Sequence, residues 1–552
     1  MSSKENLRKL LVTNALPYAN GPLHLGHLLE HIQTDMWVRF QRLKGHECLY
    51  VAGDDAHGTP IMLKAEELEI SPEALIKKVY KEHLKDLNAF LISYDNYYTT
   101  HSPENKILSE QIFNLADQKG LIEKKEIKQL FDTKKEMFLS DRYVKGDCPN
   151  CNALNQYGDN CEICSSTYSA IELANPISQL SNSIPELRNS EHLFFNLKKL
   201  KQEIQEWLLS SDIQEPVINK MQEWLSADLR DWDISRDIPY FGFEIPSHPN
   251  KFFYVWLDAP IGYIASTQNY LSTTNSHQTL LDIWGIKSEY EIFHFIGKDV
   301  MYFHTLFWPA LLDAGNFKKP EGVYVHGFLT INGEKMSKSR GTFILAKDYV
   351  KYLNPEYLRY FFSTKLGDGI EDIDMNLDDF KQRVNSDLVG KYINIASRSA
   401  KFINNNFSNT LSDELDKPEL IDEFIDSQEL ISNLFEKRLF SKAVREIMTL
   451  ADKANQYFDS KQPWVIAKQD AKSKEVQKIC TTTLNLFKIL SIYLHPVIPN
   501  ITNDAFKFLN LKKQSWNEIS SLLTSSKINK YEALIYRIEG KDLDSIQNES
   551  KV

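Results

Sequence analysis

The segment Lys9-Leu-Leu-Val-Thr-Asn-Ala15 begins the part of the sequence that decides the fold. It is short and apolar, which is typical of a buried strand. A turn rich in proline and glycine follows at residues 17–22, and apolar residues then recur at helical spacing from Leu28 to Phe40. A second apolar run, Cys48-Leu-Tyr-Val-Ala52, ends in Gly-Asp-Asp at Asp55. This strand–helix–strand order predicts a βαβ unit in a parallel, Rossmann-like sheet.

The sheet pattern is interrupted and then resumes. From about residue 111 to residue 233 the chain carries a cysteine cluster and several helical patterns, so we expect an insertion in this region. Two strand-like runs follow, Lys251–Asp258 and Ile292–Gly297, and both end in polar or glycine residues. Ligands bind at such strand ends in open α/β sheets. The sequence therefore predicts an α/β domain split by an insertion.

The last third of the chain has a different pattern. Residues 391–539 contain no glycine, and apolar residues recur at three- and four-residue spacing from Phe380 onward. We expect an all-helical bundle from Asp378. The polar end of the chain, Asp542–Val552, is expected to be frayed.

Composition limits the class of protein. Of 552 residues, 42% are hydrophobic and 25% charged, which excludes a collagen, a disordered tail and a disulfide-stapled miniprotein. The net charge of −11 argues against non-specific coating of duplex DNA and against binding to an anionic membrane. The N-terminus lacks the charged-then-apolar pattern of a secretory signal, and no segment is apolar enough to span a bilayer. We expect a cytoplasmic protein without a membrane partner.

The segment Pro22-Leu-His-Leu-Gly-His27 lies where the first helix should begin. His24 and His27 are three residues apart, so both imidazoles share one helix face beside the backbone amides of a helix N-terminus, a favourable place for an anion. Gly26 has no side chain and leaves room for a flat base. Taken alone, this pattern is equally typical of a capping turn with surface histidines.

A second motif, Lys335-Met-Ser-Lys-Ser339, follows an Asn-Gly turn. Lys335 and Lys338 would be able to hold a departing pyrophosphate, whose developing charge is the main obstacle to phosphoanhydride cleavage. A solvated basic loop is the ordinary alternative.

The four clustered cysteines form two Cys-x-x-Cys pairs, which supply the thiolates of a closed structural Zn²⁺ site: Cys148, Cys151, Cys161 and Cys164.

Together, in this order and within a split βαβ sheet, the two motifs resemble the paired signature of class I aminoacyl-tRNA synthetases. The runs Ala15–Gly21, Asp54–Thr59, Trp232–Asp237 and Tyr254–Pro260 resemble the methionyl-tRNA synthetase family in particular. The resemblance extends from about Leu10 to Arg537 and includes the four-cysteine knuckle. It implies methionine–tRNA ligase activity in two steps, adenylate formation and transfer to tRNA. Positioning and electrostatic stabilisation carry such chemistry without a side-chain nucleophile.

The resemblance also implies roles for single residues. His24, His27, Lys335 and Lys338 would stabilise the α-phosphate transition state and the pyrophosphate. ATP would contact His24, Gly26, His27, Gly297, Asp299 and Lys338. The methionine pocket would consist of Leu16, Tyr18, Asp55, Trp256, Pro260, Tyr263, His304 and Trp308, with the Asp55 carboxylate on the substrate ammonium. Arg236 would lie near this site, and Asn394, Arg398 and Trp464 would read the anticodon.

Several of these assignments also agree with residue chemistry. A thioether is a weak acceptor, so a methionine site must rely on shape and on sulfur–aromatic contacts. Asn394 and Arg398 share a helix face in a basic window, Lys391–Asn406, that contains no acid. Trp464 would offer a stacking platform for an unpaired base. For each aromatic residue taken alone, a place in the core is the commoner outcome.

The expected parts of the chain are residues 1–115 and 235–325 (two catalytic halves), 116–234 (the connective insertion with the zinc knuckle), 326–388 (the Lys-Met-Ser-Lys-Ser loop and stem-contact region) and 389–552 (the helical anticodon-binding domain). Expected cofactors are one structural Zn²⁺ and Mg²⁺ with ATP. Expected partners are methionine, ATP and tRNA(Met), both initiator and elongator. A monomer is expected, because the chain ends soon after the bundle.

Two alternatives remain. The first is another class I ligase, for leucine, isoleucine, valine or cysteine. The branched-chain enzymes carry a large editing insertion, whereas the insertion here is occupied by the cysteine knuckle, and the cysteine enzyme would use zinc at the substrate thiol. The second is a tRNA-binding protein with an inactive synthetase fold. The intact His24, His27, Lys335 and Lys338 argue against that alternative.

Overall fold

Six parallel strands form the central sheet, in the order β10-β15-β14-β1-β2-β3. Their bounds are β1 Lys9–Asn14, β2 Glu47–Asp54, β3 Asn96–Thr99, β10 Asp212–Ile213, β14 Tyr290–Gly297 and β15 Gly322–His326. The computed structural model describes residues 7–158, 161, 163, 164, 166, 168–226, 229–336 and 342–549. From β1 the chain continues to β2 and β3 on one side, and it later adds β14 and β15 on the other. The carboxyl ends of β1 and β14 are therefore a topological switch point, where ligands bind in such sheets.

The predicted βαβ unit is present. Helix α1, Leu25–Lys44, connects β1 to β2 and is buried along most of its length. The helices α2 (Thr59–Glu67), α3 (Pro72–Ala89) and α4 (Pro103–Gln118) continue this first half, and α7 (Val255–Thr273), α8 (Leu280–Trp284), η4 (Phe303–Phe307, a π-helix) and α9 (Trp308–Ala314) belong to the second half.

One strand prediction is wrong. The run Lys251–Asp258 contains only a short strand, β13 (Lys251–Phe253), which pairs antiparallel with β12 (Ser235–Asp237) outside the central sheet. Helix α7 begins immediately after it, at Val255. The first half of this helix is buried on nearly all sides, so its sequence is apolar without a period that would separate helix from strand.

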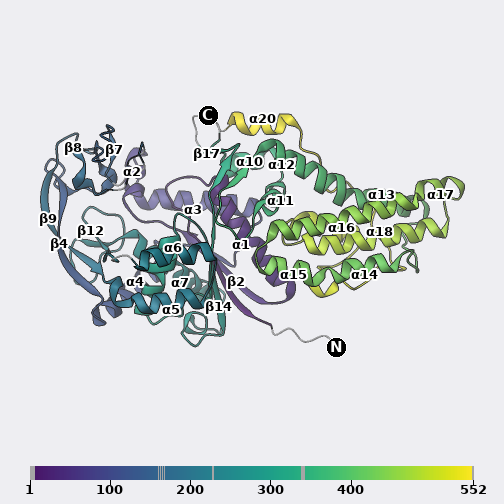
Figure 1. Cartoon of the computed structure of the whole chain (residues 1–552), viewed down its shortest axis with the longest axis horizontal. Helices are drawn as coiled ribbons and strands as arrows, with labels where there is room; N and C mark the ends of the chain where they lie inside the picture. The colour runs from purple at the N-terminus through teal and green to yellow at the C-terminus, as the bar shows by residue number, and fades with distance from the viewer. Residues whose placement is uncertain are drawn as a thin grey trace.

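The insertion projects from the sheet as a long antiparallel ribbon, visible at the left of Figure 1. Strands β4 (Ile122–Asp132) and β9 (Glu186–Phe195) form the ribbon, with β5 (Met137–Phe138) and β11 (Trp232–Asp233) at its edges. A small sheet of β6 (Val144–Asp147), β7 (Gln156–Tyr157) and β8 (Ala174–Ser178) lies near the cysteines. The chain returns through α5 (Lys201–Ser210), β10 and α6 (Glu215–Ser226).

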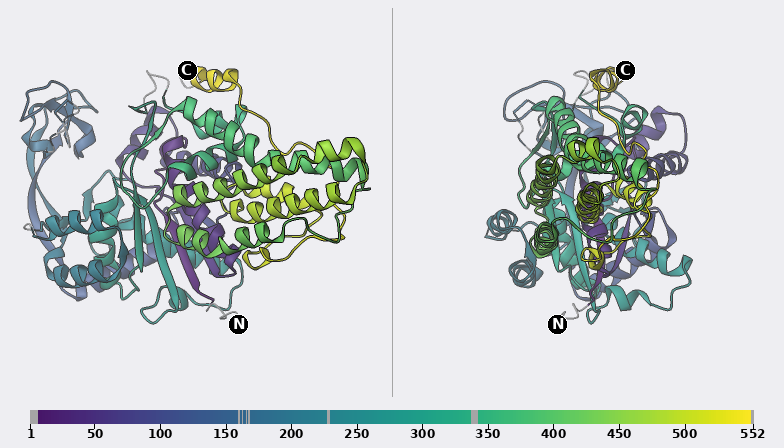
Figure 2. Two further views of the ribbon diagram at one scale, coloured as in Figure 1. Left: turned by 45° about the vertical axis from the view of Figure 1, so that its right-hand side comes forward. Right: turned by 90° about the vertical axis from the view of Figure 1, so that its right-hand side faces the viewer.

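The helical bundle extends to the opposite end of the molecule (Figures 1 and 2). It contains α12 (Leu377–Arg383), η5 (Val384–Ile393, a π-helix), α13 (Asn394–Asn406), α14 (Pro418–Asp426), α15 (Gln428–Glu436), α16 (Phe440–Lys461), α17 (Pro463–Gln469), α18 (Lys474–Leu494) and α19 (Pro499–Phe508). Nearly every residue of α18 is buried, so this helix is the core of the bundle. A region of three short strands, β16 (Leu329–Ile331), β17 (Glu334–Lys335) and β18 (Ile373–Met375), with α10 (Ala346–Tyr352) and α11 (Pro355–Lys365), joins it to the sheet.

The expectation of a frayed C-terminus is wrong for the described residues 542–549. Helix α20, Gly540–Glu549, buries Leu543 and Ile546 in a small apolar contact that includes Tyr349 of α10. The Lys351 ammonium lies 2.5 Å from the Glu549 carboxylate. Two apolar residues at helical spacing and one ion pair therefore dock this otherwise polar segment. Among the helices that the structure describes, none is both long and apolar enough to span a bilayer.

Candidate active site

The two histidines of the first motif cap helix α1. The His24 imidazole accepts the Gly26 N–H at Nδ1, over 3.1 Å, and the His27 imidazole accepts the His24 N–H at Nδ1, over 3.3 Å. The rings stack with their centroids 3.7 Å apart. The expectation that free backbone amides surround the anion site is thus wrong for these two amides, because the imidazoles already satisfy them.

Burial keeps both imidazoles neutral. It lowers the pKa of His24 to about 4 and the pKa of His27 well below its ordinary value, with a further lowering by the neighbouring ring. A neutral imidazole that accepts at Nδ1 carries its hydrogen at Nε2. Each ring can therefore donate one N–H bond to a phosphate oxygen at neutral pH, as a neutral donor.

The segment that follows the second motif is joined to the first motif through the backbone. The Leu25 N–H donates to the Ile344 carbonyl over 3.1 Å, and the Ala346 N–H donates to the Leu23 carbonyl over 2.9 Å. A Cβ on Gly26 would lie 2.5 Å from Cε of Met336, so the methyl group of Met336 fills the space beside this glycine. A base can approach the backbone there only after Met336 moves. The backbone of Lys335 lies in β17, and Lys338 lies outside the described residues.

A cavity of about 80 Å³ lies at the switch point, between the ends of β1 and β2, α7 and the segment after β14. Six of the eight residues predicted for methionine line it: Leu16, Asp55, Trp256, Pro260, Tyr263 and His304. Tyr18 lies beside it and donates its hydroxyl hydrogen to the His57 carbonyl over 2.5 Å. Trp308 is fully buried behind Tyr263, and its indole N–H donates to His294 over 3.0 Å.

The polar ends of the aromatic wall are bonded to each other. His304 Nδ1 donates to the Val300 carbonyl over 3.0 Å, so Nε2 accepts the Tyr263 hydroxyl over 2.8 Å. Burial lowers the pKa of His304 to about 4 and keeps the ring neutral. With these groups satisfied, the wall offers mainly ring surface, which suits a polarizable thioether.

Asp55 is the exception in this cavity. Its side chain is buried, and its Oδ1 has no hydrogen-bond partner among the described residues. Burial, together with the nearby Asp258 carboxylate, raises its pKa well above the ordinary value. An uncompensated carboxyl group in a small apolar cavity is a suitable partner for a substrate ammonium.

Trp256 lies at the mouth of the cavity and is 43% exposed. Its ring packs on Phe303, with centroids 4.1 Å apart. The sequence interpretation missed Phe303, although it precedes His304 directly. Arg236, which the family resemblance placed near this site, lies over the ring of Tyr254, 3.7 Å from its centroid, and Tyr254 in turn packs on Trp256.

Gly297 ends β14 and Asp299 follows it, at the other side of the switch point. A Cβ on Gly297 would lie 2.5 Å from Oδ1 of Asp299, so the Asp299 carboxylate lies directly against this glycine. The sequence interpretation missed a buried polar group beneath it, in which Glu30 lies 3.5 Å from His326 and hydrogen-bonds Asn14. Glu30 follows His27 by three residues, and this helical spacing was a signal that pointed to the same face of α1.

Comparison with known proteins identifies the family. Residues 10–400 match the sequence model of the family described as tRNA synthetases class I (M). The chain belongs to this family. Residues 412–548 also match the family described as the anticodon binding domain of methionyl tRNA ligase. The class I (M) chain is therefore a methionine–tRNA ligase, and the alternatives of another class I ligase or an inactive homologue are set aside.

Solved structures agree on the fold. The methionyl-tRNA synthetase of Mycobacterium tuberculosis in complex with methionyl-adenylate aligns with a TM-score of 0.78 and 22% identity, over 96% of this chain and 99% of that chain. The apo form of the M. tuberculosis enzyme aligns with a TM-score of 0.72 and 20% identity, over 98% of this chain and 100% of that chain. At this identity the likeness establishes the shared fold.

The four cysteines of this class I (M) synthetase come together at the tip of the insertion. The Sγ atoms of Cys148 and Cys164 are 3.8 Å apart, those of Cys151 and Cys161 are 3.6 Å apart, and all four lie within 4.8 Å of one another. None forms a disulfide. Four sulfurs about 2.3 Å from a tetrahedral Zn²⁺ would be separated by roughly 3.8 Å. The cluster fits a zinc ion, as the sequence predicted.

The residues predicted to read the anticodon lie at the end of the bundle. The Arg398 guanidinium lies over the ring of Trp464, 5.3 Å from its centroid, and over the ring of Phe458. Arg398 also forms an ion pair with Asp459 of α16. In the same way the Lys391 ammonium lies 2.8 Å from Asp452, and Asn394 donates to Asn455 over 3.2 Å. Two basic residues of the window, Lys391 and Arg398, are therefore compensated by acids of the neighbouring helix α16.

Proposed function

We propose that the ligase forms methionyl-adenylate in the cleft between its two motifs. The methionine carboxylate attacks the α-phosphate of ATP, and pyrophosphate leaves. Neutral His24 and His27 donate from Nε2 to phosphate oxygens, while Lys335 and Lys338 compensate the charge of the departing pyrophosphate. The backbone hydrogen bonds that join residues 344–346 to the start of α1 carry this proposal, because they bring the chain segment of the second motif to the first.

Methionine is proposed to occupy the cavity at the switch point. The Asp55 carboxylate would hold the ammonium, because one of its oxygens is buried without a partner. The thioether would contact Trp256, Tyr263 and His304, and the polar groups of Tyr263 and His304 are bonded to each other. Leu16 and Pro260 would shape the remaining wall, Tyr18 lies beside it, and Trp308 would support Tyr263 from behind.

MgATP is the proposed second substrate. Its adenosine would meet Gly297 and Asp299, and its phosphates would lie over His24, Gly26, His27 and Lys338. The space beside Gly26, which Met336 fills, supports a movement of the second motif when the nucleotide binds. The 3′-terminal ribose hydroxyl of tRNA(Met) then attacks the acyl carbon of the adenylate and releases AMP.

Anticodon reading is proposed for Asn394, Arg398 and Trp464, in initiator and elongator tRNA(Met) alike.

Zinc held by the four cysteines would stabilise the insertion and take no part in the reaction. The proposed parts of this monomer are residues 1–115, 116–234, 235–325, 326–388 and 389–552. Strand β10 of the central sheet lies inside the proposed insertion, so the insertion contributes one strand to the catalytic sheet.

Amino-acid-dependent ATP–pyrophosphate exchange tests this proposal, measured with all twenty amino acids. Exchange is expected with methionine. The substitution Lys335→Ala should slow adenylate formation while leaving the Kd for methionine near that of the unmodified enzyme. An equal loss in both measurements would contradict the role given to Lys335.

For the structural ion we expect a content of one zinc per chain. The variant Cys161→Ser should lose this zinc and, with it, the protease resistance of the insertion.

A further inference from the structure

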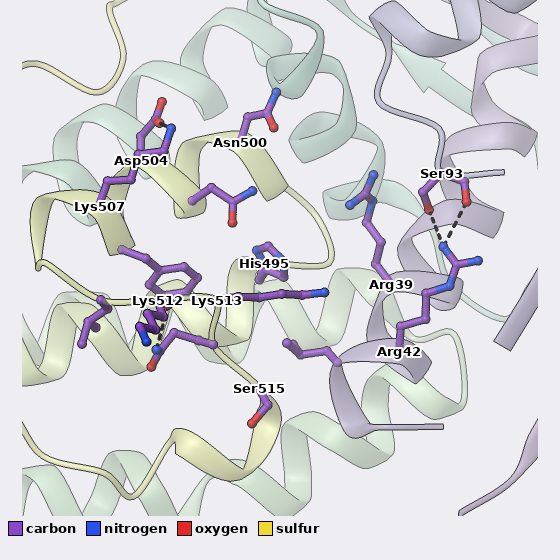
Figure 3. Close-up of a pocket in the computed structure, with 15 residues that line it drawn as sticks. Arg39, Arg42, Ser93, His495, Asn500, Asp504, Lys507, Lys512, Lys513 and Ser515 are labelled. Atoms are coloured by element: carbon purple, nitrogen blue, oxygen red, sulfur yellow. Dashed lines mark hydrogen bonds and ion pairs between the residues drawn. The ribbon is translucent and has the colours of Figure 1, made fainter. Parts of the chain in front are cut away.

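A second, larger cavity lies where the catalytic domain meets the bundle. Its volume is about 1050 Å³, and it is lined by the end of α1, by α19 and by the segment that follows α19 (Figure 3). Arg39 follows His24 by fifteen residues of helix, so the cavity begins roughly 20 Å from the active-site histidines. None of its lining residues belongs to the methionine cavity.

The wall of this cavity carries excess positive charge. Asp35 compensates Arg39 over 2.6 Å, but the same carboxylate also pairs with the buried Arg359 over 2.7 Å. Lys512 and Lys513 are exposed and form no ion pair with any residue that the structure describes. In a protein with a net charge of −11, such a concave basic surface favours an anionic ligand.

His495 adds a directional group. The Thr502 hydroxyl donates to the Ile498 carbonyl over 3.0 Å, so its oxygen accepts the hydrogen of His495 Nδ1 over 2.8 Å. Nε2 is then an acceptor, and within the described ranges it has no partner. Burial and the charges of Arg39 and Lys513 lower the pKa of His495 to about 4, so the ring is neutral at pH 7. Figure 3 shows His495 and Lys513 adjacent to each other at the cavity.

Two complementary features therefore face one space: ammonium groups that suit a phosphate, and an imidazole acceptor that requires an N–H or O–H donor. Inorganic phosphate suits the ammonium groups, but it has no base or ribose to fill the rest of a cavity of about 1050 Å³. We propose that the cavity binds a nucleotide, with its phosphate at Lys512 and Lys513 and a base amine or ribose hydroxyl donating to His495 Nε2. Because small-ligand pockets measure about 300–1,000 Å³, the cavity has room for a nucleotide that is free or part of an RNA chain.

Isothermal titration calorimetry on the full-length protein tests this inference. The active site is first filled with methionyl-adenylate from methionine and ATP, and free ATP and pyrophosphate are then removed by gel filtration. The probes are then cytidine monophosphate, a cytidine tetranucleotide and inorganic phosphate, at pH 7.5. Binding of at least one nucleotide is expected. If only the tetranucleotide binds, the natural ligand is an RNA chain. If the monophosphate binds as tightly as the tetranucleotide, the natural ligand is a free nucleotide.

Matched variants localise the binding. The double variant Lys512→Ala/Lys513→Ala should weaken nucleotide binding roughly tenfold or more. The variant Lys77→Ala/Lys78→Ala removes two neighbouring exposed lysines of α3 and should bind like the unmodified protein. His495→Asn retains a donor toward Thr502 but deletes Nε2, so it should weaken nucleotides and spare phosphate.

Three outcomes would overturn the inference: no nucleotide binding at millimolar concentration, an equal loss in both lysine pairs, or phosphate binding as tight as that of both nucleotides. Methionine-dependent pyrophosphate exchange should stay unchanged in the Lys512→Ala/Lys513→Ala variant. This control separates the new site from the catalytic one and verifies that the variant is folded.

Discussion

The methionine cavity and the anticodon end of the bundle both present polar and aromatic side chains to expected ligands, but their charges are arranged differently. At the cavity, Asp55 is buried with one oxygen unpartnered, and its pKa is raised by burial. At the bundle, Arg398 is partly exposed, paired with Asp459 and packed over Trp464.

The difference has an energetic consequence. A desolvated group without a partner has lost its hydration and regains an interaction only when the ligand arrives, so its contribution to binding is large. A solvated, paired group exchanges one partner for another and contributes little. Substitutions at the cavity should therefore change chemistry and methionine binding strongly, and substitutions at the bundle should change tRNA binding moderately.

The largest effect is expected at the histidine pair. His27→Ala removes one neutral N–H donor from the α-phosphate and the cap on the His24 amide. Loss of such a donor in a water-excluded site costs about 10²–10³ in rate. Pre-steady-state adenylate formation should fall by this factor while the Kd for methionine changes little. His277→Ala, at an exposed histidine, is the control; an unchanged rate in His27→Ala would refute the electrostatic role of the pair.

The next effect is expected at Asp55. Asp55→Asn keeps the shape of the side chain and removes the charge that would meet the ammonium. Hydrogen bonds to charged groups contribute about 1.5–3 kcal/mol, so the KM for methionine in pyrophosphate exchange should rise roughly 10- to 100-fold. Asp117→Asn, on the exposed face of α4, should leave it unchanged. A KM increase below threefold in Asp55→Asn would show that the ammonium is held elsewhere.

The raised pKa of Asp55 also predicts how binding and stability depend on pH. Methionine requires the carboxylate, so its KM should fall as pH rises through the folded-state pKa of Asp55, and Asp55→Asn should abolish this dependence. The stability of the folded protein changes with pH in the opposite direction. The folded protein holds the proton more tightly than the unfolded chain, so ionisation of Asp55 costs stability as pH rises. The substitution should therefore raise Tm at pH 8 by more than at pH 5.

The sequence predicted the helices and strands around this site wherever apolar residues recur at one clear spacing. The β1–α1–β2 unit followed from short apolar runs and one helical stripe. The failures have physical causes of their own. Helix α7 is buried on nearly all sides of its first half, so the run after Lys251 has no apolar period. Helix α20 buries just two side chains, Leu543 and Ile546, which is too short an apolar pattern to predict a docked helix.

Contacts between residues that are far apart in the chain also could not be predicted from the sequence. The capping bonds of His24 and His27 depend on ring orientation, which no residue pattern specifies. The acids that compensate the basic window lie on α16, and Asp459 is 61 residues from Arg398. The meeting of the two catalytic motifs followed from the family resemblance, since nothing in local periodicity brings Met336 to Gly26.

A moderate effect is expected at Trp464. Base–aromatic stacking contributes about 1–3 kcal/mol, so Trp464→Ala should lower kcat/KM for tRNA(Met) charging by roughly 10-fold or more. Pyrophosphate exchange without tRNA should be unaffected, because α17 lies far from the cleft at the end of the bundle (Figure 1). Tyr536→Ala removes an aromatic side chain that is 73% exposed and serves as the control. An equal loss in exchange and charging would contradict anticodon contact.

The smallest effect is expected at Asp459. Asp459→Asn removes the exposed carboxylate that holds Arg398, and a surface ion pair contributes about 0–1 kcal/mol. The free guanidinium should bind RNA slightly better, so the KM for tRNA should fall by less than about fivefold, and more at low ionic strength than at high. Asp452→Asn removes the nearer of the two carboxylates beside Lys391 and provides a matched comparison on the same helix, α16. A large change at Asp459, comparable to that of Asp55, would mean that the bundle recognises its ligand through a buried charge and would remove the proposed contrast between the two ends of the molecule.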